Sequence, residues 1–358
     1  MFSKQDTNKV KGLAIMLMVF HHCFLAPARY AGQEVIFAPF SEASINSVAL
    51  SMKICVALFT FLSGYGIAIS YSKMTDYSAK NIAKNIFRRW RNLIMPFVFT
   101  WVLLNLYSLV MGIGWFTHTY GKGLRSILYA AIDALGLAQI FGTPTFISTF
   151  WYMSLAQIII VVFPLLYLMY KKLGPVVLMI IASVISALFF TKTLYPLTKS
   201  CLAFFPQYIV IVCFGLICSD RNLLVKIRDY AVSSNAIINK VVHFVVFGGL
   251  TIAGFYLRPF VRLTNYIGIY DVAFCLVIIM FMFEFINNIP VVNNIFYFFG
   301  IHSMTIFLIH SFIRVAWYYD FTYSFKYVFL IPLVLLLISL AVAVVIDWLY
   351  KVIFRRKK

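Results

Sequence analysis

The sequence predicts an all-α membrane protein, a polytopic bundle of about ten transmembrane helices with both termini in the cytoplasm. Apolar side chains make up 63% of the 358 residues and charged side chains only 11%, whereas about a quarter of a soluble domain is charged. The apolar residues form runs of a length that can cross a bilayer, which needs about 20 residues per helix. Basic residues at the borders of these runs then orient the bundle.

Ten apolar runs are separated by charged residues or by Gly, Pro and Asn. The expected spans cover residues 10–26, 47–71, 92–113, 147–170, 175–192, 202–218, 241–258, 269–287, 295–313 and 327–350. A further apolar segment at 124–141 contains Asp133 and ends before a Thr-Pro pair, so we interpret it as an interfacial or re-entrant helix. The sequence contains no evident internal repeat, and we expect residues 1–358 to form a single domain.

The formal net charge of +19 comes from Lys and Arg residues at the borders of the apolar runs. This placement favours anionic lipid over nucleic acid as the partner. With a cytoplasmic N-terminus and ten crossings, 20 of the 30 basic residues fall on the inner side. The six cysteines lie inside apolar runs without metal-ligand spacing, so we expect packing residues and no metal.

Lys11 and His22 are the most informative ionisable residues of the first span. They are eleven residues apart, close to three helical turns, so they share one helix face with roughly 16 Å between them along the axis. Ionisable side chains inside a membrane are costly and mark functional sites by default. An imidazole also suits a general base. The alternative for His22 is a histidine that hydrogen-bonds between helices.

Arg88, Arg89 and Arg91 form a basic cluster in an inner loop before the third span. Guanidinium groups suit phosphates, so the cluster could hold the phosphates of a cytosolic nucleotide-like donor. The alternative is simple anchoring to anionic lipid.

Ser63 and Tyr65 interrupt the apolar second span, where they could line a polar path or support close helix packing. In the ninth span, His302 and His310 are eight residues apart. They therefore lie about 80° apart around the helix and do not form a tight metal pair. One of them could face a cavity, while His302 near the span end suits a packing or interfacial role.

Taken together, these segments resemble the acyltransferase 3 family of integral membrane proteins. KGLAIMLMVFHH at 11–22 is similar to the first-span motif of that family, a basic residue and a histidine with ten positions between them. FTFLSGYGIA, FRRWRNLIMPF, FWYMSLAQI and FGIHSMTIFLIHS follow in the order of the family. The chain departs from the family pattern in having Lys11 instead of arginine, His21 instead of glycine or an aromatic residue, and Asn8 where aspartate is frequent.

The resemblance implies a stand-alone, multi-pass O-acyltransferase of the bacterial plasma (inner) membrane. It implies an acyl-CoA donor, usually acetyl-CoA, and a hydroxyl of a cell-surface or lipid-linked glycan as acceptor. His22 would act as base or acyl relay and Lys11 would steer or stabilise charge. Arg88, Arg89 and Arg91 would bind the CoA phosphates, and Ser63, Tyr65 and His310 would line the substrate path.

Two rival functions use the same residues differently. A transporter or flippase of a lipid-linked glycan also needs polar residues in mid-membrane, but the matching broken helices of many transporters are not evident in the two halves of this sequence. A catalytically silent scaffold would not need an intramembrane histidine. The acceptor, its hydroxyl and the length of the acyl group stay open, as does the choice between direct transfer and an acyl-histidine relay.

Overall fold

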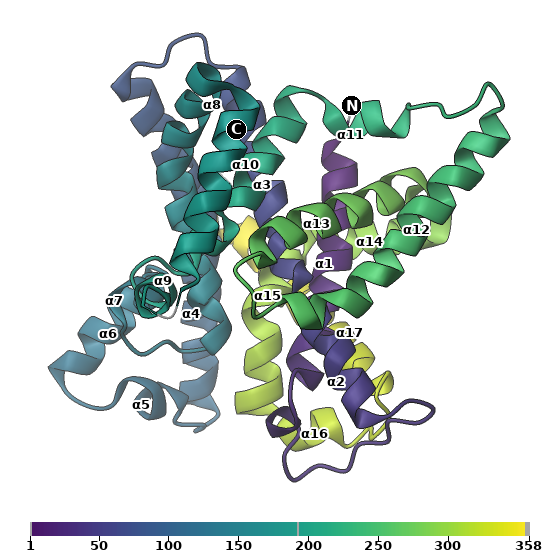
Figure 1. Ribbon diagram of the computed structural model, residues 1–358. Helices are drawn as coiled ribbons and strands as arrows, with labels where there is room; N and C mark the ends of the chain where they lie inside the picture. The colour runs from purple at the N-terminus through teal and green to yellow at the C-terminus, as the bar shows by residue number, and fades with distance from the viewer. Residues whose placement is uncertain (1, 192, 355–358) are drawn as a thin grey trace.

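The computed structural model describes residues 2–191 and 193–354, and it confirms the all-α fold class. In this described part, the one strand-like contact is an isolated bridge between Ile36 and Tyr327. Figure 1 shows the helices crossing one another in a bundle. α1 begins near the top of the view, and α2, α5 and α16 lie at the bottom.

The long helices are α1 (Lys4–Phe24), α3 (Ile54–Ser72), α4 (Ala79–Val110), α8 (Trp151–Phe189), α10 (Phe205–Asp220), α12 (Ala236–Val261), α13 (Ile267–Glu284) and α17 (Leu330–Phe354). The shorter helices are α2 (Glu42–Ser51), α5 (Trp115–Tyr120), α6 (Leu124–Ala134), α7 (Ala138–Phe141), α9 (Tyr195–Lys199), α11 (Leu223–Arg228), α14 (Pro290–Ile301), α15 (Ser303–Phe312) and α16 (Tyr319–Tyr323). Four short turns complete the set: η1 (Pro27–Arg29), η2 (Ser148–Phe150), η3 (Ile286–Asn288) and the π-helical η4 (Ile313–Trp317).

Each of the ten predicted spans overlaps one or more of these helices. By length and apolar composition, six helical segments among the described residues can cross a membrane, or seven if one bent pair is counted as a span. α8 overlaps two predicted spans, 147–170 and 175–192, and breaks between them at Gly174, where φ is 81°. Its 39 residues exceed what one crossing needs. The count of ten and the cytoplasmic termini stay predictions.

The ninth predicted span, 295–313, is not the straight helix that the apolar run suggests. α14 and the helix that begins at Ser303 meet at an angle of 71°. His302 lies at the bend, and its Nδ1 is 2.5 Å from Oδ2 of Asp347 on α17. A tertiary contact to a residue 45 positions later therefore accompanies the bend.

The apolar segment at 124–141 forms two short helices, α6 and α7, instead of one. Asp133 near the end of α6 is fully buried. Its carboxylate accepts hydrogen bonds from the Tyr120 hydroxyl at 2.6 Å and from the backbone N–H of Phe146 at 2.7 Å. The Thr145 hydroxyl donates a further bond at 2.8 Å. A buried carboxylate is tolerated when it is satisfied in this way, so we assign Asp133 a structural role.

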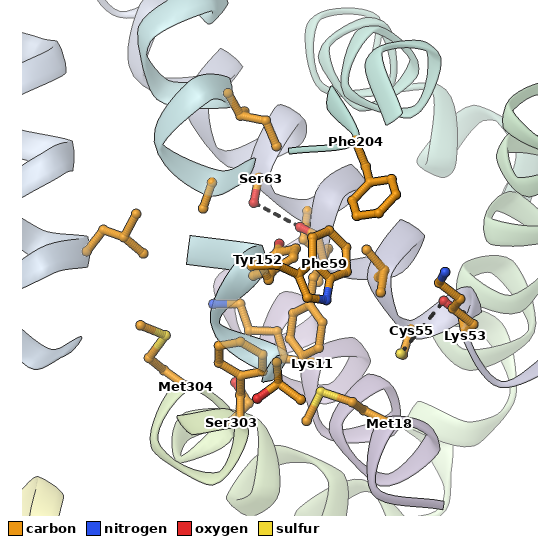
Figure 2. Close-up of a pocket in the computed structure, with 18 of the residues that line it drawn as sticks. Lys11, Met18, Lys53, Cys55, Phe59, Ser63, Tyr152, Phe204, Ser303 and Met304 are labelled. Carbon is orange, nitrogen blue, oxygen red and sulfur yellow. Dashed lines mark hydrogen bonds between the residues drawn. The ribbon is translucent and has the colours of Figure 1, made fainter. Parts of the chain in front are cut away.

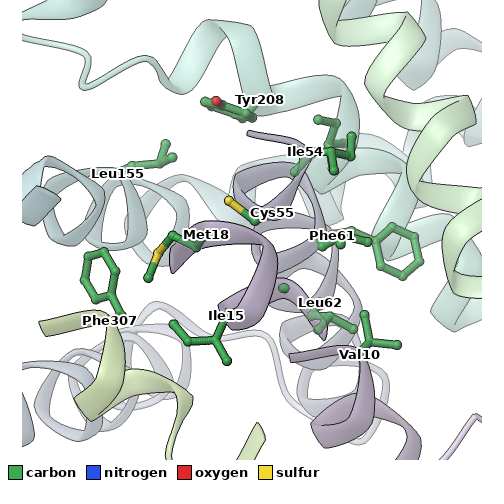
Figure 3. Packing of buried hydrophobic residues seen from close by; sticks show 14 of the residues in the cluster. Val10, Ile15, Met18, Ile54, Cys55, Phe61, Leu62, Leu155, Tyr208 and Phe307 are labelled. Carbon is green, nitrogen blue, oxygen red and sulfur yellow. The ribbon is translucent and has the colours of Figure 1, made fainter. Parts of the chain in front are cut away.

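The N-terminal helix is fixed at its start and packed closely along its length. Ser3 and Asp6 form a reciprocal capping box at the first turn of α1. A Cβ atom at Gly300 of α14 would overlap with the carbonyl oxygen of Asn8, so α1 and α14 touch backbone to backbone. Small residues allow this approach in membrane proteins. Figure 3 shows how side chains of α1 and α3, including Val10, Ile15 and Leu62, pack together in the core.

Candidate active site

A cavity of about 800 Å³ lies between α1, α3, α4, α8 and α15, and we call it the central cavity. Figure 2 shows Lys11, Ser63, Tyr152 and Ser303 meeting in it from four different helices. Apolar side chains such as Phe59 and Phe307 make up much of the rest of the wall. A mostly apolar pocket with a few convergent polar groups is typical of a small-molecule site.

The central cavity follows the length of α1, from Thr7 to Leu25. α3 runs antiparallel to α1, because Phe2 packs on Tyr65 while His21 reaches Ala49 just before α3. Lys11, Gly66 and Arg89 therefore lie at one end, which we call the inner end after the predicted orientation. Arg29 and the start of α3 lie at the outer end. Since Lys11 and His22 both line the cavity, it extends roughly 16 Å along the helix between them.

His22 is half-buried and lines the central cavity. Neither of its ring nitrogens has a hydrogen-bond partner among the residues that the structure describes. The neighbouring rings of His21 and His310 have their centroids 5.0 Å and 5.2 Å away. His22 is therefore an imidazole enclosed by other side chains with its nitrogens available to a molecule in the cavity.

The two neighbouring histidines are held in place by hydrogen bonds. Nδ1 of His21 donates to the carbonyl oxygen of Ala49 at 2.7 Å. Nδ1 of His310 lies 2.9 Å from the carbonyl oxygen of Phe307, so it carries the proton. Nε2 of His310 can then accept from the Ser311 hydroxyl at 2.9 Å. His310 lies beside His22 but is fully buried and is not part of the cavity wall.

Lys11 lines the inner end of the cavity and forms no ion pair with any residue in the described ranges. The nearby carboxylate of Asp6 is engaged by Lys9 at 3.5 Å and by the Asn287 amide at 3.0 Å. The ammonium group of Lys11 is therefore available to an anion in the cavity.

The three arginines of the basic cluster lie in different surroundings, because successive residues of a helix point about 100° apart. Arg89 lines the cavity and donates from Nε to Asn85 at 3.0 Å and from Nη2 to the carbonyl oxygen of Gly66 at 3.3 Å. Arg88 and Arg91 are exposed and do not line it; Arg88 donates to Ser70 at 3.3 Å.

Ser63 and Tyr65 also differ in their surroundings, because only Ser63 lines the cavity. Ser63 lines the cavity, and its hydroxyl donates to the carbonyl oxygen of Phe59 one turn earlier at 2.9 Å. Tyr65 is 2% exposed and packs between Phe2 and Phe61, away from the cavity wall. Of the residues expected at the site, the structure brings Lys11, His22, Ser63 and Arg89 into one space.

Several cavity residues were missed by sequence reasoning. Ser303 and Tyr152 line the middle of the cavity, and the cations Arg29, Lys53 and Lys199 line the outer end. Ser303 lies in the Gly-x-x-Ser segment that carried the family resemblance, three positions after Gly300, and this spacing was the available signal. The outer cations come from three separate elements, so no local pattern connects them.

Other buried ionisable residues are paired away from the cavity. Arg258 of α12 forms two hydrogen bonds of 2.8 Å with Asp271 of α13. His243 and Glu284 form a second pair between the same helices, with Nδ1 to Oε1 at 2.8 Å. Buried charges are tolerated when they are paired in this way, and we interpret these residues as structural.

Comparison with known proteins identifies the family of the chain. A family model described as an acyltransferase domain matches residues 8–350. No curated protein and no solved structure matches the chain. The matched range includes α3, α4, α8 and α15 and all of α1 except its first turn. The chain therefore belongs to the acyltransferase 3 family and is an integral membrane acyltransferase.

Proposed function

We propose that this protein transfers an acyl group, most simply acetyl, from cytoplasmic acetyl-CoA to a hydroxyl of a cell-surface or lipid-linked glycan in the bacterial plasma membrane. The observation that carries the proposal is His22, whose ring nitrogens have no partner among the described residues although the ring lines the central cavity. The cavity also continues to a basic inner end, where an anionic donor can bind.

The inner end suits the donor because CoA carries phosphates. Arg89 reaches the cavity wall from α4 and is held by Asn85, which itself donates to Ser70 at 3.1 Å. Arg88 and Arg91 on the exposed surface of the same helix would contact the parts of CoA that stay outside the cavity. Lys11 lines the same inner end and would steer the anionic donor into the cavity or stabilise its charge there.

In direct transfer, the acceptor oxygen attacks the thioester carbonyl carbon while His22 takes the hydroxyl proton. The C–S bond then breaks, and the imidazolium returns its proton to the leaving CoA thiolate. In the relay form, a nitrogen of His22 first bonds to the acyl carbon, and the C–S bond breaks to release CoA as its thiolate. The acceptor oxygen then attacks the acyl carbon, the bond to the imidazole breaks, and the hydroxyl proton passes to the CoA thiolate. In this account Ser63 and Ser303 help to position the reacting groups. His310 supports the His22 ring from behind the cavity wall, whereas Tyr65 packs away from the cavity.

The direct test uses purified protein in proteoliposomes that contain surface polysaccharide from cells lacking the gene. With [¹⁴C]acetyl-CoA outside, we expect base-labile label in the polysaccharide. Acetyl phosphate, which lacks the nucleotide, should give none. Absence of label with every polysaccharide fraction of the source cell would remove the proposal.

A binding measurement distinguishes the acyltransferase from the alternative function, a glycan flippase. Acetyl-CoA should raise the melting temperature of the detergent-solubilised enzyme, because a ligand that binds only the folded state stabilises it. A glycan flippase should show no such response to acetyl-CoA.

A further inference from the structure

The outer end of the central cavity is as basic as the inner end, and the proposed donor does not account for this. Arg29 from η1, Lys53 at the start of α3 and Lys199 at the end of α9 all line it. We call these three residues the outer basic cluster. Figure 2 shows Lys53 beside Cys55, across the view from Met304.

No acidic residue lines the central cavity anywhere in the part of the chain that the structure describes. The acids near the outer end have other partners. Asp271 is held by Arg258, Asp133 by Tyr120, Glu42 by Tyr30, Glu34 by Lys326 and Asp320 by Gln33. The side chains of Arg29, Lys53 and Lys199 form no hydrogen bond or ion pair with another described residue. The cluster therefore has positive charge that the protein leaves without a counter-ion.

Such an arrangement is costly without a ligand. Arg29 and Lys53 are partly buried, and each loses hydration without gaining an anionic partner from the described chain. An anion bound at this end would remove this cost.

The remaining residues of the outer end suit a sugar. Trp151 and Phe204 pack edge to face with centroids 5.1 Å apart, and both line the cavity. Aromatic faces of this kind offer apolar area to the C–H faces of a pyranose ring. Gln139, Ser148 and Thr149 add side chains that can hydrogen-bond to hydroxyl groups.

We propose that the acceptor is an anionic saccharide, one that carries a phosphate or carboxylate near the acylated hydroxyl, and that the outer basic cluster binds this group. The inference rests on the proposed acyltransferase function and specifies its acceptor. The anionic group would hold the sugar at the outer end, with a hydroxyl directed along the cavity toward His22.

The test compares three monosaccharides as inhibitors of acetyl transfer to the polysaccharide: glucose, glucose 1-phosphate and glucuronate. We expect the two anions to inhibit and glucose to have little effect. The Arg29→Gln/Lys53→Gln variant should weaken this inhibition and raise the KM for polysaccharide about tenfold or more, the size expected for lost hydrogen bonds to a charged group. Its KM for acetyl-CoA should stay within about twofold, which also shows that the variant is folded.

Lys122→Gln is the matched control, because Lys122 is exposed on the same predicted side and does not line the cavity. Equal inhibition by glucose, or an equal effect of Lys122→Gln, would overturn the proposal. The assays are run in bilayers of neutral and of anionic lipid. An effect of the double variant that appears only with anionic lipid would assign the cluster to lipid headgroups instead.

Failure of the acyltransferase proposal itself is distinguishable. Thermal stabilisation by glucose 1-phosphate but not glucose, lost in the Arg29→Gln/Lys53→Gln variant, reports the anion site without any turnover. If the protein shows this stabilisation but transfers no acetyl group, the anion site is supported and the proposed acyltransferase function is excluded. Acetyl transfer with no selectivity for anionic sugars would support the acyltransferase function and exclude the anion site.

Discussion

Two regions of this bundle use the same kinds of ionisable residue in opposite ways. Between α12 and α13, Arg258 and His243 are paired with Asp271 and Glu284, and all four side chains are at most 11% exposed. Around the central cavity, Lys11 and His22 have no ion-pair or hydrogen-bond partner in the described part of the chain. Pairing therefore contributes to the fold, whereas a cation or imidazole left open to a cavity is available to a ligand.

The largest effect is expected when His22, in the unpaired region around the central cavity, loses its side chain. His22→Ala should reduce acetyl transfer by about 100-fold or more, the usual contribution of a positioned general base. Its melting temperature should stay close to that of the wild type, because His22 makes no hydrogen bond to the described residues. Transfer assays and thermal unfolding in detergent measure the two quantities.

His21→Ala is the matched control for that experiment. His21 adjoins His22 and also lines the cavity, but its Nδ1 donates to the carbonyl oxygen of Ala49 and the residue is 5% exposed. Its loss leaves a buried carbonyl group without this donor, so the main effect should be on stability. Full activity of His22→Ala would exclude His22 as base and as relay.

Substitutions in the paired region between α12 and α13 should lower the stability of the folded protein. Arg258→Leu leaves Asp271 as a buried carboxylate without its partner, which costs about 3–5 kcal/mol. The double variant Arg258→Leu/Asp271→Leu removes both charges and should recover most of that loss. Unfolding of the three proteins in detergent provides the comparison. A double variant as unstable as the single one would show that the pair contributes through something other than charge compensation.

The comparison also shows which features sequence reasoning could reach. The helices were predictable because an apolar run of bilayer length has few alternatives. Lys11 and His22 could be connected because one helix relates them through its periodicity. The break of α8 at Gly174 also coincides with the boundary expected between two spans.

Features that depend on tertiary contacts were not predictable. The bend at His302 accompanies a contact to Asp347, which is remote in the sequence. The outer basic cluster combines η1, α3 and α9, and Lys53 could be recognised only as a cation near a span end. Arg88, Arg89 and Arg91 looked equivalent in the sequence, yet only Arg89 reaches the cavity.

That last difference leads to a smaller expected effect. Arg89→Gln should raise the KM for acetyl-CoA about tenfold, the size of one lost charge-assisted hydrogen bond. Arg91→Gln on the exposed surface should change it less, since a solvated charge contributes little. Steady-state kinetics with varied acetyl-CoA test both variants. Equal effects would mean that the arginines attract the donor as a diffuse charge. The position of Arg89 in the cavity wall would then make no difference to donor binding.

The smallest effect concerns a pair that is formed but exposed. Lys326 donates to Glu34 at 2.6 Å, and both side chains are at least half exposed. This hydrogen bond lowers the pKa of the Glu34 carboxyl. The pair therefore stabilises the folded protein above the ordinary pKa of glutamate, and this stabilisation is lost as the pH falls through the lowered pKa.

Glu34→Gln should accordingly produce only a slight decrease in melting temperature at pH 7, because water and salt screen the exposed pair. The difference from wild type should disappear in acid, where Glu34 is protonated in both folded and unfolded chains. Acetyl transfer should be unchanged, since neither residue lines the central cavity. A decrease as large as that of Arg258→Leu would contradict the comparison, because it would mean that pairing stabilises this bundle equally where water is present and where it is excluded.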